Sequence, residues 1–260
     1  MAHTIYENFV LENKVEDLLT TALDMNNYLT TDYSLAEEAG MKKVINVYTA
    51  TGNVEDLTMG QGNSESIEVS FTPVEYKVGT TQGHFTYYDE QEMTDPMVVD
   101  VGLRGIADKM TNDLTSKVIA ELGKATLTAA VNWTFDSIVD AIAKLNVEDE
   151  TGLFLLVNPA QKAVIRKNLG TELKYVEDFA RTGYIGSVCG VPVIVSKAVP
   201  AGEGYLATKE AVKAFVKKGV SIEQEREANF RKNDIYARKV MLIALADATK
   251  VVKLTTAVGG

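Results

Sequence analysis

The residue types best suited to chemistry lie in one uncharged stretch, YIGSVCGVPVIVS, which spans residues 184–196 and contains the only cysteine, Cys189. A cysteine becomes a nucleophile when a neighbouring base or a lowered pKa produces its thiolate. Glycine-rich turns can instead bring backbone N–H groups against a phosphate group. The stretch is therefore open to three interpretations: a phosphate-binding loop, a nucleophile site around Cys189, or part of a packing surface.

The spacing of the glycines argues against a phosphate-binding loop. Gly183, Gly186 and Gly190 match neither G-x-G-x-x-G nor G-x-x-x-x-G-K-[ST]. The strand-like segment VPVIVS follows them, where a phosphate site would require the N-terminus of a helix.

A nucleophile at Cys189 lacks a recognisable base. No motif connects Cys189 with His3 or His84, and one cysteine with two distant histidines cannot complete a zinc site. The acidic residues of YYDEQE, residues 87–92, are expected in a solvated turn before a helix rather than as a catalytic carboxylate pair. We therefore predict a protein that is not an enzyme and uses no cofactor or metal, with Cys189 as a small buried hydrophobe.

The composition describes a folded protein with a large core. The chain has 260 residues, 46% of them hydrophobic, which suffices for one large domain or two closely packed ones. A single cysteine excludes an intramolecular disulfide, so folding is expected in a reducing compartment such as the cytoplasm. The longest apolar run, VMLIALA, is far shorter than the roughly 20 residues of a membrane-spanning helix, and no export signal is recognised at the N-terminus.

The formal net charge of −10 is unevenly distributed. Residues 1–204 contain 15 Lys and Arg against 30 Asp and Glu, whereas residues 205–260 contain 11 against 6. The basic residues of the C-terminal segment alternate with acidic ones, so they form no continuous basic stripe for nucleic acid. We expect instead that the acidic and basic parts of different copies of this chain meet.

Extended elements must position these residues. Residues 1–40 lack a sustained hydrophobic period and predict an arm, with NKVEDLLTTALDM compatible with a short helix. Residues 41–94 predict a long β-hairpin around a glycine-rich turn, with a bulge at Thr72 and Pro73 because the apolar alternation slips there by one residue. A partner would be needed to bury the apolar side chains of the arm, which are Tyr6, Phe9, Val10 and Leu11.

A long helix follows the hairpin. Asp95 is the candidate N-cap, Pro96 takes the first helical position, and Gly123 lies just past the end. About 27 residues at 1.5 Å each make a rod of roughly 40 Å. The rest of the chain predicts a mixed α/β region with the helices FDSIVDAIAKL and NPAQKAVIRKNLG, the buried strand LFLLVN between them, and further strands to the C-terminus.

This order of parts resembles the Hong Kong 97-type fold of the major capsid proteins of tailed bacteriophages. The resemblance is strongest in LVNPAQKAVIRKNLG, YIGSVCGVPVIVSKAVP and ARKVMLIALADATKVVKL. The segments YENFVLENKVEDLL and QGHFTYYDEQEMTDPMVVD are similar to capsid proteins of phages and prophages of low-GC Gram-positive bacteria. The resemblance covers nearly the whole chain and implies an α+β fold in which YIGSVCGVPVIVS is a packed strand pair near the junction of two domains.

The resemblance also implies a division of the chain into five regions. These are an N-terminal arm (1–40), an extended β-hairpin loop (41–94), a spine helix of the peripheral domain (95–129), an axial domain (130–204), and peripheral-domain strands with the C-terminus (205–260).

The function implied is that of a structural protein of the virion. Copies of the chain would form the hexamers and pentamers of an icosahedral head that encloses double-stranded DNA without reading its sequence. Assembly would take place in the host bacterial cytoplasm, with a separate scaffolding protein, a portal and optional decoration proteins as further partners. We expect charged contacts between copies, with acidic candidates Glu55, Asp56, Glu65 and Glu68 in the hairpin and basic candidates Lys217, Lys218, Arg231, Lys232 and Arg238.

Two departures from parts of this family carry expectations. The chain leaves no room for the N-terminal scaffolding domain of some members, so a separate scaffolding protein or an already mature form is expected. No lysine lies between Thr51 and Ser70, so the covalent cross-linking that some members make through the extended loop is not expected, and shells should dissociate in denaturant.

Two alternatives stay open at this point. One is an encapsulin-like nanocompartment shell, whose gene neighbours would encode a cargo protein rather than portal, protease and terminase proteins. The other is a small α/β hydrolase or transferase that uses Cys189, which the substitution Cys189→Ala would test.

Overall fold

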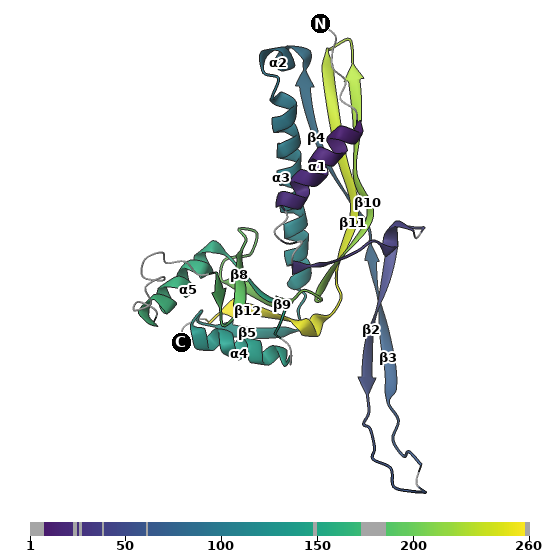
Figure 1. Ribbon diagram of the computed structural model, residues 1–260, viewed down its shortest axis with the longest axis vertical. Coiled ribbons are helices and arrows are strands. Elements are labelled where there is room, and N and C mark those ends of the chain that lie inside the picture. The colour runs from purple at the N-terminus through teal and green to yellow at the C-terminus, as the bar shows by residue number, and fades with distance from the viewer. Residues whose placement is uncertain are drawn as a thin grey trace.

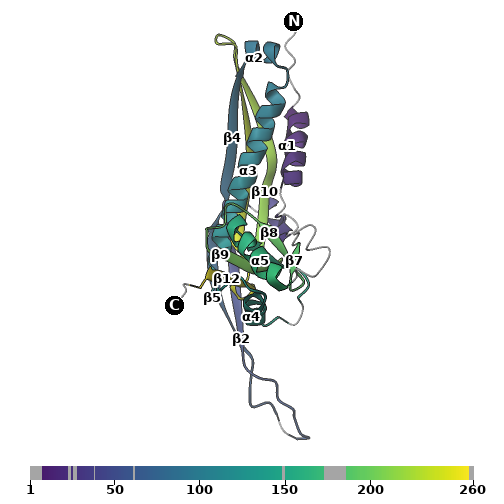
Figure 2. The same cartoon turned by 90° about the vertical axis from the view of Figure 1, so that its left-hand side faces the viewer.

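The computed structural model describes residues 8–22, 25, 28–37, 39–60, 62–147, 150–172 and 186–257. The molecule is elongated, with a long helix and long strands along its main body, a smaller domain to one side, and a two-stranded hairpin that extends from the end of the body (Figures 1 and 2). The fold is therefore mixed α and β, as predicted.

A four-stranded sheet and a long helix form the main body. The strand order is β1-β10-β11-β4, in which β1 runs parallel to β10 and the other neighbours are antiparallel. The long helix α3 packs along this sheet (Figure 2), and a short helix, α2, precedes it at the far end. The bounds of these elements are β1 (Thr30–Asp32), β4 (Gly79–Tyr88), β10 (Val212–Glu227), β11 (Lys232–Leu245), α2 (Asp89–Thr94) and α3 (Val98–Leu122).

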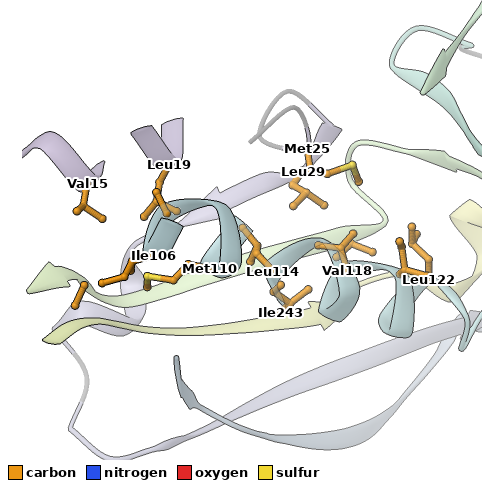
Figure 3. Packing of buried hydrophobic residues seen from close by; sticks show 14 of the residues in the cluster. Val15, Leu19, Met25, Leu29, Ile106, Met110, Leu114, Val118, Leu122 and Ile243 are labelled. Atoms are coloured by element: carbon orange, nitrogen blue, oxygen red, sulfur yellow. The ribbon is translucent and has the colours of Figure 1, made fainter. Parts of the chain in front are cut away.

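Helix α3 packs because its apolar residues recur every four positions. This spacing places Ile106, Met110, Leu114, Val118 and Leu122 on one face, where all five are buried (Figure 3). With 25 residues, the helix is about 37 Å long, close to the predicted rod.

The long helix ends where it was predicted to end, before Gly123, but it begins later. Asp95 is not its N-cap, because residues 89–94 already form α2 and Asp95 closes that helix. The Asp95 carboxylate accepts a hydrogen bond from Met97 N at 2.9 Å, and the turn through Pro96 separates α2 from α3.

Helix α1 (Asn8–Ala22) packs against the main body. Its residues Leu11, Val15 and Leu19 are buried, and the helix contacts α3 and β10 of the same chain. Figure 3 shows Val15 and Leu19 beside α3. The expectation that Leu11 needs another subunit for its burial was therefore wrong. Val10 is exposed, whereas Tyr6 and the side chain of Phe9 lie outside the described residues.

The smaller domain is built on a six-stranded sheet of order β5-β12-β9-β6-β8-β7, with the helices α4 and α5. The predicted strand LFLLVN is β6, and all five of its residues are buried. The bounds are β5 (Leu127–Val131), β6 (Leu153–Val157), β7 (Ser187–Val188), β8 (Val191–Val195), β9 (Glu203–Thr208), β12 (Val251–Thr256), α4 (Phe135–Leu145) and α5 (Pro159–Glu172).

Residues 205–260, expected as one unit of strands, contribute to both sheets. Strands β10 and β11 lie in the main body, whereas β9 and β12 lie in the six-stranded sheet. The two sheets are therefore linked by the chain on both sides of the long β10–β11 pair, and a 3-10 helix, η3 (Ala248–Lys250), leads into β12.

The extended hairpin consists of β2 (Lys42–Thr51) and β3 (Glu68–Lys77). Their antiparallel pairing is continuous, with Pro73 opposite Asn46 and Thr72 opposite Val47, so the bulge predicted at Thr72 and Pro73 was wrong. The ribbon has only two strands in the described residues, which leaves β3 an open edge that accepts a proline. Both faces of β3 are largely exposed, so its apolar alternation can change face without a bulge.

Candidate functional site

One face of the extended hairpin carries exposed apolar side chains. Tyr48 and Phe71 are directly opposite each other in the ladder, with exposed fractions of 66% and 61%. Val69 lies two residues before Phe71 and Val44 four residues before Tyr48, both on the same face, and both are exposed. A contiguous exposed apolar surface on a projecting element is typical of a protein–protein contact.

The connection at the tip of the hairpin is both apolar and acidic. Val54, Leu57 and Met59 are exposed there. Between Lys43 and Lys77 the sequence contains no Lys, Arg or His. All four acidic candidates, Glu55, Asp56, Glu65 and Glu68, lie in or next to this connection.

Glu55 has a structural role within the tip. Its carboxylate accepts hydrogen bonds from the hydroxyl and the backbone N–H of Ser64, at 2.5 and 2.9 Å, and these bonds lower the pKa of Glu55. The residue therefore closes the loop and stays ionised.

Two of the basic candidates, Lys217 and Lys218, lie in an irregular part of β10. Six residues of β10, from Val216 to Ser221, span the same ladder as four residues of β11, from Met241 to Arg238, so β10 contains two extra residues. Lys217 is half-buried and donates a hydrogen bond to Gly40 O at 2.5 Å, whereas Lys218 is exposed.

The other three basic candidates have acidic partners within the chain. Arg231 pairs with Glu90 at 2.7 Å, Lys232 with Asp234 at 2.8 Å, and Arg238 with Glu223 at 2.7 Å. The last pair is diagonal across β10 and β11, since Glu223 is opposite Tyr236. Charge alone does not indicate these partners. The register of β10 on β11 would have revealed the pair of Arg238 with Glu223, and strand alternation the pair of Lys232 with Asp234.

A polar cluster surrounds Asp234 on the neighbouring strands β4 and β11. Asp234 accepts hydrogen bonds from Lys232, Thr86 and His84, and the His84 ring stacks on Tyr236 with centroids 4.5 Å apart. Burial alone would raise the pKa of Asp234, but these hydrogen bonds outweigh burial and lower it to about 2. These hydrogen bonds join β4 to β11 through the Asp234 carboxylate.

Cys189 forms the tip of a tight hairpin between β7 and β8. Val188 pairs with Val191, and the two connecting residues, Cys189 and Gly190, have φ of 52° and 79°. Positive φ at both positions defines a type I′ turn. The stretch YIGSVCGVPVIVS is therefore a strand pair as far as it is described, from Gly186 onward, and it lies at one edge of the six-stranded sheet.

The surroundings of Cys189 do not activate its thiol. It is partly rather than fully buried, because a turn tip cannot sink into the core, and this corrects the prediction of a buried hydrophobe. Burial, Glu150 and Asp136 each raise the pKa of Cys189. His84 is engaged with Asp234, and within the described residues no three His, Cys, Asp or Glu side chains are arranged to hold a metal ion.

The family model for phage capsid proteins matches residues 71–254. The major capsid protein of Staphylococcus phage phiMR11 is 28% identical over 170 residues, which cover 64% of this chain. The chain spans about 61% of the length of that curated relative.

Solved structures with the same architecture come from several particles. The virus-like particle from Pyrococcus furiosus superposes with a TM-score of 0.68 at 12% identity, covering 96% of this chain and all of the other. The capsid of a native GTA particle gives a TM-score of 0.75 at 11% identity, covering 99% and 93%. Mycobacterium phage Che8 gives 0.65 at 16% identity, covering 91% and 90%.

The predicted Hong Kong 97-type fold is confirmed by these superpositions. None of the helices in the described ranges is long and apolar enough to cross a membrane. The family match covers well over half of the sequence and includes most of β3, then β4, α3, the long β10–β11 pair and the six-stranded sheet as far as Leu254. The chain belongs to the phage capsid protein family.

Proposed function

We propose that this chain is the building block of an icosahedral phage head and assembles with itself into hexamers and pentamers around double-stranded DNA. The extended hairpin carries the proposal. It projects from the main body, and one of its faces exposes Val44, Tyr48, Val69 and Phe71. An isolated two-stranded ribbon is marginal in water, so these side chains need a surface supplied by another copy.

Closure makes weak contacts sufficient. Each subunit of a closed shell is held by several neighbours at once, so modest contacts add up through multiplicity. The projecting hairpin lets one subunit reach across its neighbour, and the compact six-stranded domain gives that neighbour a rigid base for symmetric packing.

Charge complementarity favours contact between the hairpin tip and the neighbour's basic residues. The acidic tip residues Glu55, Asp56, Glu65 and Glu68 have no cation near them in sequence, and Lys218 is exposed on β10. Lys217 already donates a hydrogen bond to the carbonyl oxygen of Gly40, so an acidic residue of a neighbour would be an additional partner. Arg231, Lys232 and Arg238 would have to share their carboxylate partners with those of a neighbour, which makes them the weaker candidates.

The remaining partners follow from the same proposal. Residues 1–40 would act as the arm, 41–94 as the extended loop with β4 joining the main body, 95–129 as the spine, 130–204 as the axial domain, and 205–260 as further peripheral strands with β12 joining the six-stranded sheet. A separate scaffolding protein, a portal and decoration proteins would join the shell in the host bacterial cytoplasm before the virion is released.

A net charge of −10 per subunit would repel the enclosed DNA and suit packing without adhesion.

The experiment is to express the chain and determine its mass by light scattering, with negative-stain microscopy of the same fractions. Closed shells, hexamers or pentamers are expected, and nucleic acid or a protein cargo inside closed shells separates a phage head from a nanocompartment. A stable monomer that persists after co-expression with the scaffolding protein from the same genome would contradict the proposal.

A further inference from the structure

Helix α1 takes the place of a strand along part of β10. Strand β1 pairs with β10 only from Lys213 to Phe215, which leaves the rest of this edge without a strand in the described residues. Here the backbone N–H of Ile222 donates to Glu12 Oε1 at 2.9 Å, and that of Val220 donates to Glu16 Oε2 at 3.4 Å. Two carboxylates of α1 therefore satisfy backbone donors that a neighbouring strand would otherwise take.

The spacing of the two elements explains the fit. Glutamates four residues apart on a helix are about 6 Å apart along its axis, and N–H groups two residues apart on a strand are about 6.6 Å apart. Because Glu12 meets Ile222 and Glu16 meets Val220, the helix runs antiparallel to the strand. Lys14 anchors the other side of α1 through an ion pair with Asp100 of α3.

The segment that α1 caps is the irregular part of β10. Two extra residues lie between Val216 and Ser221, and a bulged strand bends and leaves backbone groups unpaired. Glu16 binds within this bulge, at Val220. The conformation of the bulge is thus supported from outside the sheet, by a side chain of α1.

The same bulge holds the base of the extended hairpin. Lys217 donates to Gly40 O, and Gly40, with φ of 106°, lies two residues before β2. A small buried cluster also joins the sheet to the hairpin base. In it, Leu35 and Val78 at the hairpin base pack with Phe215 of β10 and Leu242 of β11. Both contacts come from residues in or next to the bulge.

We propose that residues 216–221 of β10 are a relay through which docking of α1 sets the orientation of the extended hairpin. With α1 docked, the hydrogen bond from Val220 N to Glu16 stabilises the conformation of the bulge. The bulge in turn positions Lys217, whose hydrogen bond to Gly40 O holds the backbone at the hairpin base. When α1 leaves, the bulge loses its outer support and the hairpin gains freedom about its base. The biological meaning rests on the proposed function, in which the hairpin contacts neighbours, but the coupling itself is a property of one subunit.

The test measures the two ends of the relay separately. Spin labels at Thr51→Cys on the hairpin and Ser116→Cys on α3, in a Cys189→Ala background, report the hairpin orientation as a distance distribution. Labelled chains are diluted into an excess of unlabelled full-length chains, so that only distances within one subunit are recorded. Amide hydrogen exchange at Val220 and Ile222 reports the capping by α1.

Three variants distinguish the steps. Glu12→Ala with Glu16→Ala removes both acceptors and keeps a strong helix former at each position. Asn13→Ala changes an exposed residue of the same helix and is the matched control. Lys217→Met cuts the link between the bulge and Gly40 without touching α1.

We expect the double glutamate variant to speed exchange at Val220 and Ile222 by roughly tenfold or more, as for loss of a hydrogen bond to a charged group, and to broaden the distance distribution. Lys217→Met should broaden the distribution and leave exchange at Val220 and Ile222 unchanged. Asn13→Ala should change neither the distribution nor the exchange. Faster exchange with an unchanged distribution in the glutamate variant would overturn the coupling, and unchanged exchange would overturn the capping. Both readouts are obtained whether or not the chain assembles, so failure of the shell proposal is seen separately, as absence of shells in the unlabelled protein.

Discussion

The rings of Tyr48 and Phe71 lie opposite each other on the extended hairpin, with centroids 6.1 Å apart and planes inclined by 50°. A tilted pair of this kind contributes about 0.5–1.5 kcal/mol to the hairpin itself. Complete burial of an apolar side chain of this size contributes about 1.5–3 kcal/mol. Most of the free energy available from these two rings is therefore released only when another surface covers them.

Replacing Tyr48 and Phe71 together by Ala is expected to weaken assembly far more than it weakens the subunit. Loss of the ring pair should lower the free energy of unfolding of unassembled subunits by no more than about 1.5 kcal/mol. Light scattering would measure the assembled fraction, and urea titration the unfolding. Thr72→Ala, an exposed change on the opposite face of the ribbon, is the control and should assemble normally. Normal assembly of the double variant would exclude this face as a contact surface.

Elements with a strong local signal could be predicted from the sequence. The apolar residues of α3 recur every four positions up to Leu122, and Gly123 follows, so its end was found. Strand β6 is apolar throughout because it is buried on both faces. The start of α3 was missed because Asp95 and Pro96 were taken as its N-cap and first helical position, whereas they lie in the turn between α2 and α3.

Features that depend on two distant segments could not be predicted. The β10 bulge is defined by the pairing of β10 with β11, and the sequence of β10 alone does not indicate how many residues of β11 lie opposite it. The capping of Val220 and Ile222 by α1 joins residues more than 200 positions apart. The candidate contact residues were selected by charge alone, which is why the partners of Arg231 and Arg238 within the chain were missed.

Charge reversal at the hairpin tip tests the proposed contact with β10. Glu65→Lys is expected to reduce assembly, and Lys218→Glu in the same chain to restore part of it if the two residues face each other between copies. Each exposed ion pair contributes only about 0.2–1 kcal/mol, but the same pair would recur at every subunit contact of the shell, so its loss should measurably reduce assembly. Lys197→Glu, on an exposed residue elsewhere, is the control. The contact is not at these residues if assembly and its salt sensitivity stay the same in both single variants.

Asp234→Asn is expected to destabilise the subunit in a pH-dependent way. The pKa of Asp234 is about 2 in the folded protein, below the ordinary value of 3.8, so its stabilising contribution is present above pH 4 and is lost as the pH falls toward 2. The variant should therefore lose about 1–3 kcal/mol at pH 7, and the difference from the unmodified protein should shrink between about pH 4 and pH 2. Urea unfolding of unassembled subunits at several pH values measures this, with Asp108→Asn on the exposed side of α3 as the control. A difference that is constant with pH would mean that the hydrogen bonds to the carboxylate are not the cause.

Two glycines of α3 should respond to the same substitution in opposite directions. A Cβ at Gly102 would lie 2.4 Å from the ring of Phe85 on β4, whereas a Cβ at Gly105 meets nothing within 4 Å. Gly105→Ala is expected to stabilise the subunit by about 0.5–1 kcal/mol, because alanine loses less backbone entropy in a helix. Gly102→Ala should lose that gain and a further 1–3 kcal/mol, roughly, because the ring must leave its place against α3. Thermal unfolding of the two variants measures the difference, and equal shifts would show that Phe85 does not pack as described.

Cys189 allows the structural and the catalytic interpretations to be separated by one substitution. In a type I′ turn both central residues have positive φ, and Asn-Gly is the preferred pair, so Cys189→Asn should fold with a stability equal to or above that of the unmodified chain. Cys189→Val places a β-branched residue in the left-handed region and should cost about 1–3 kcal/mol. Since the pKa of the thiol is raised, alkylation at pH 7 should be slower than that of an exposed cysteine in a peptide. If Cys189→Asn folds and assembles normally, the residue serves the turn. If it folds but abolishes a measurable hydrolase or transferase activity of the chain, the packing interpretation of this hairpin falls.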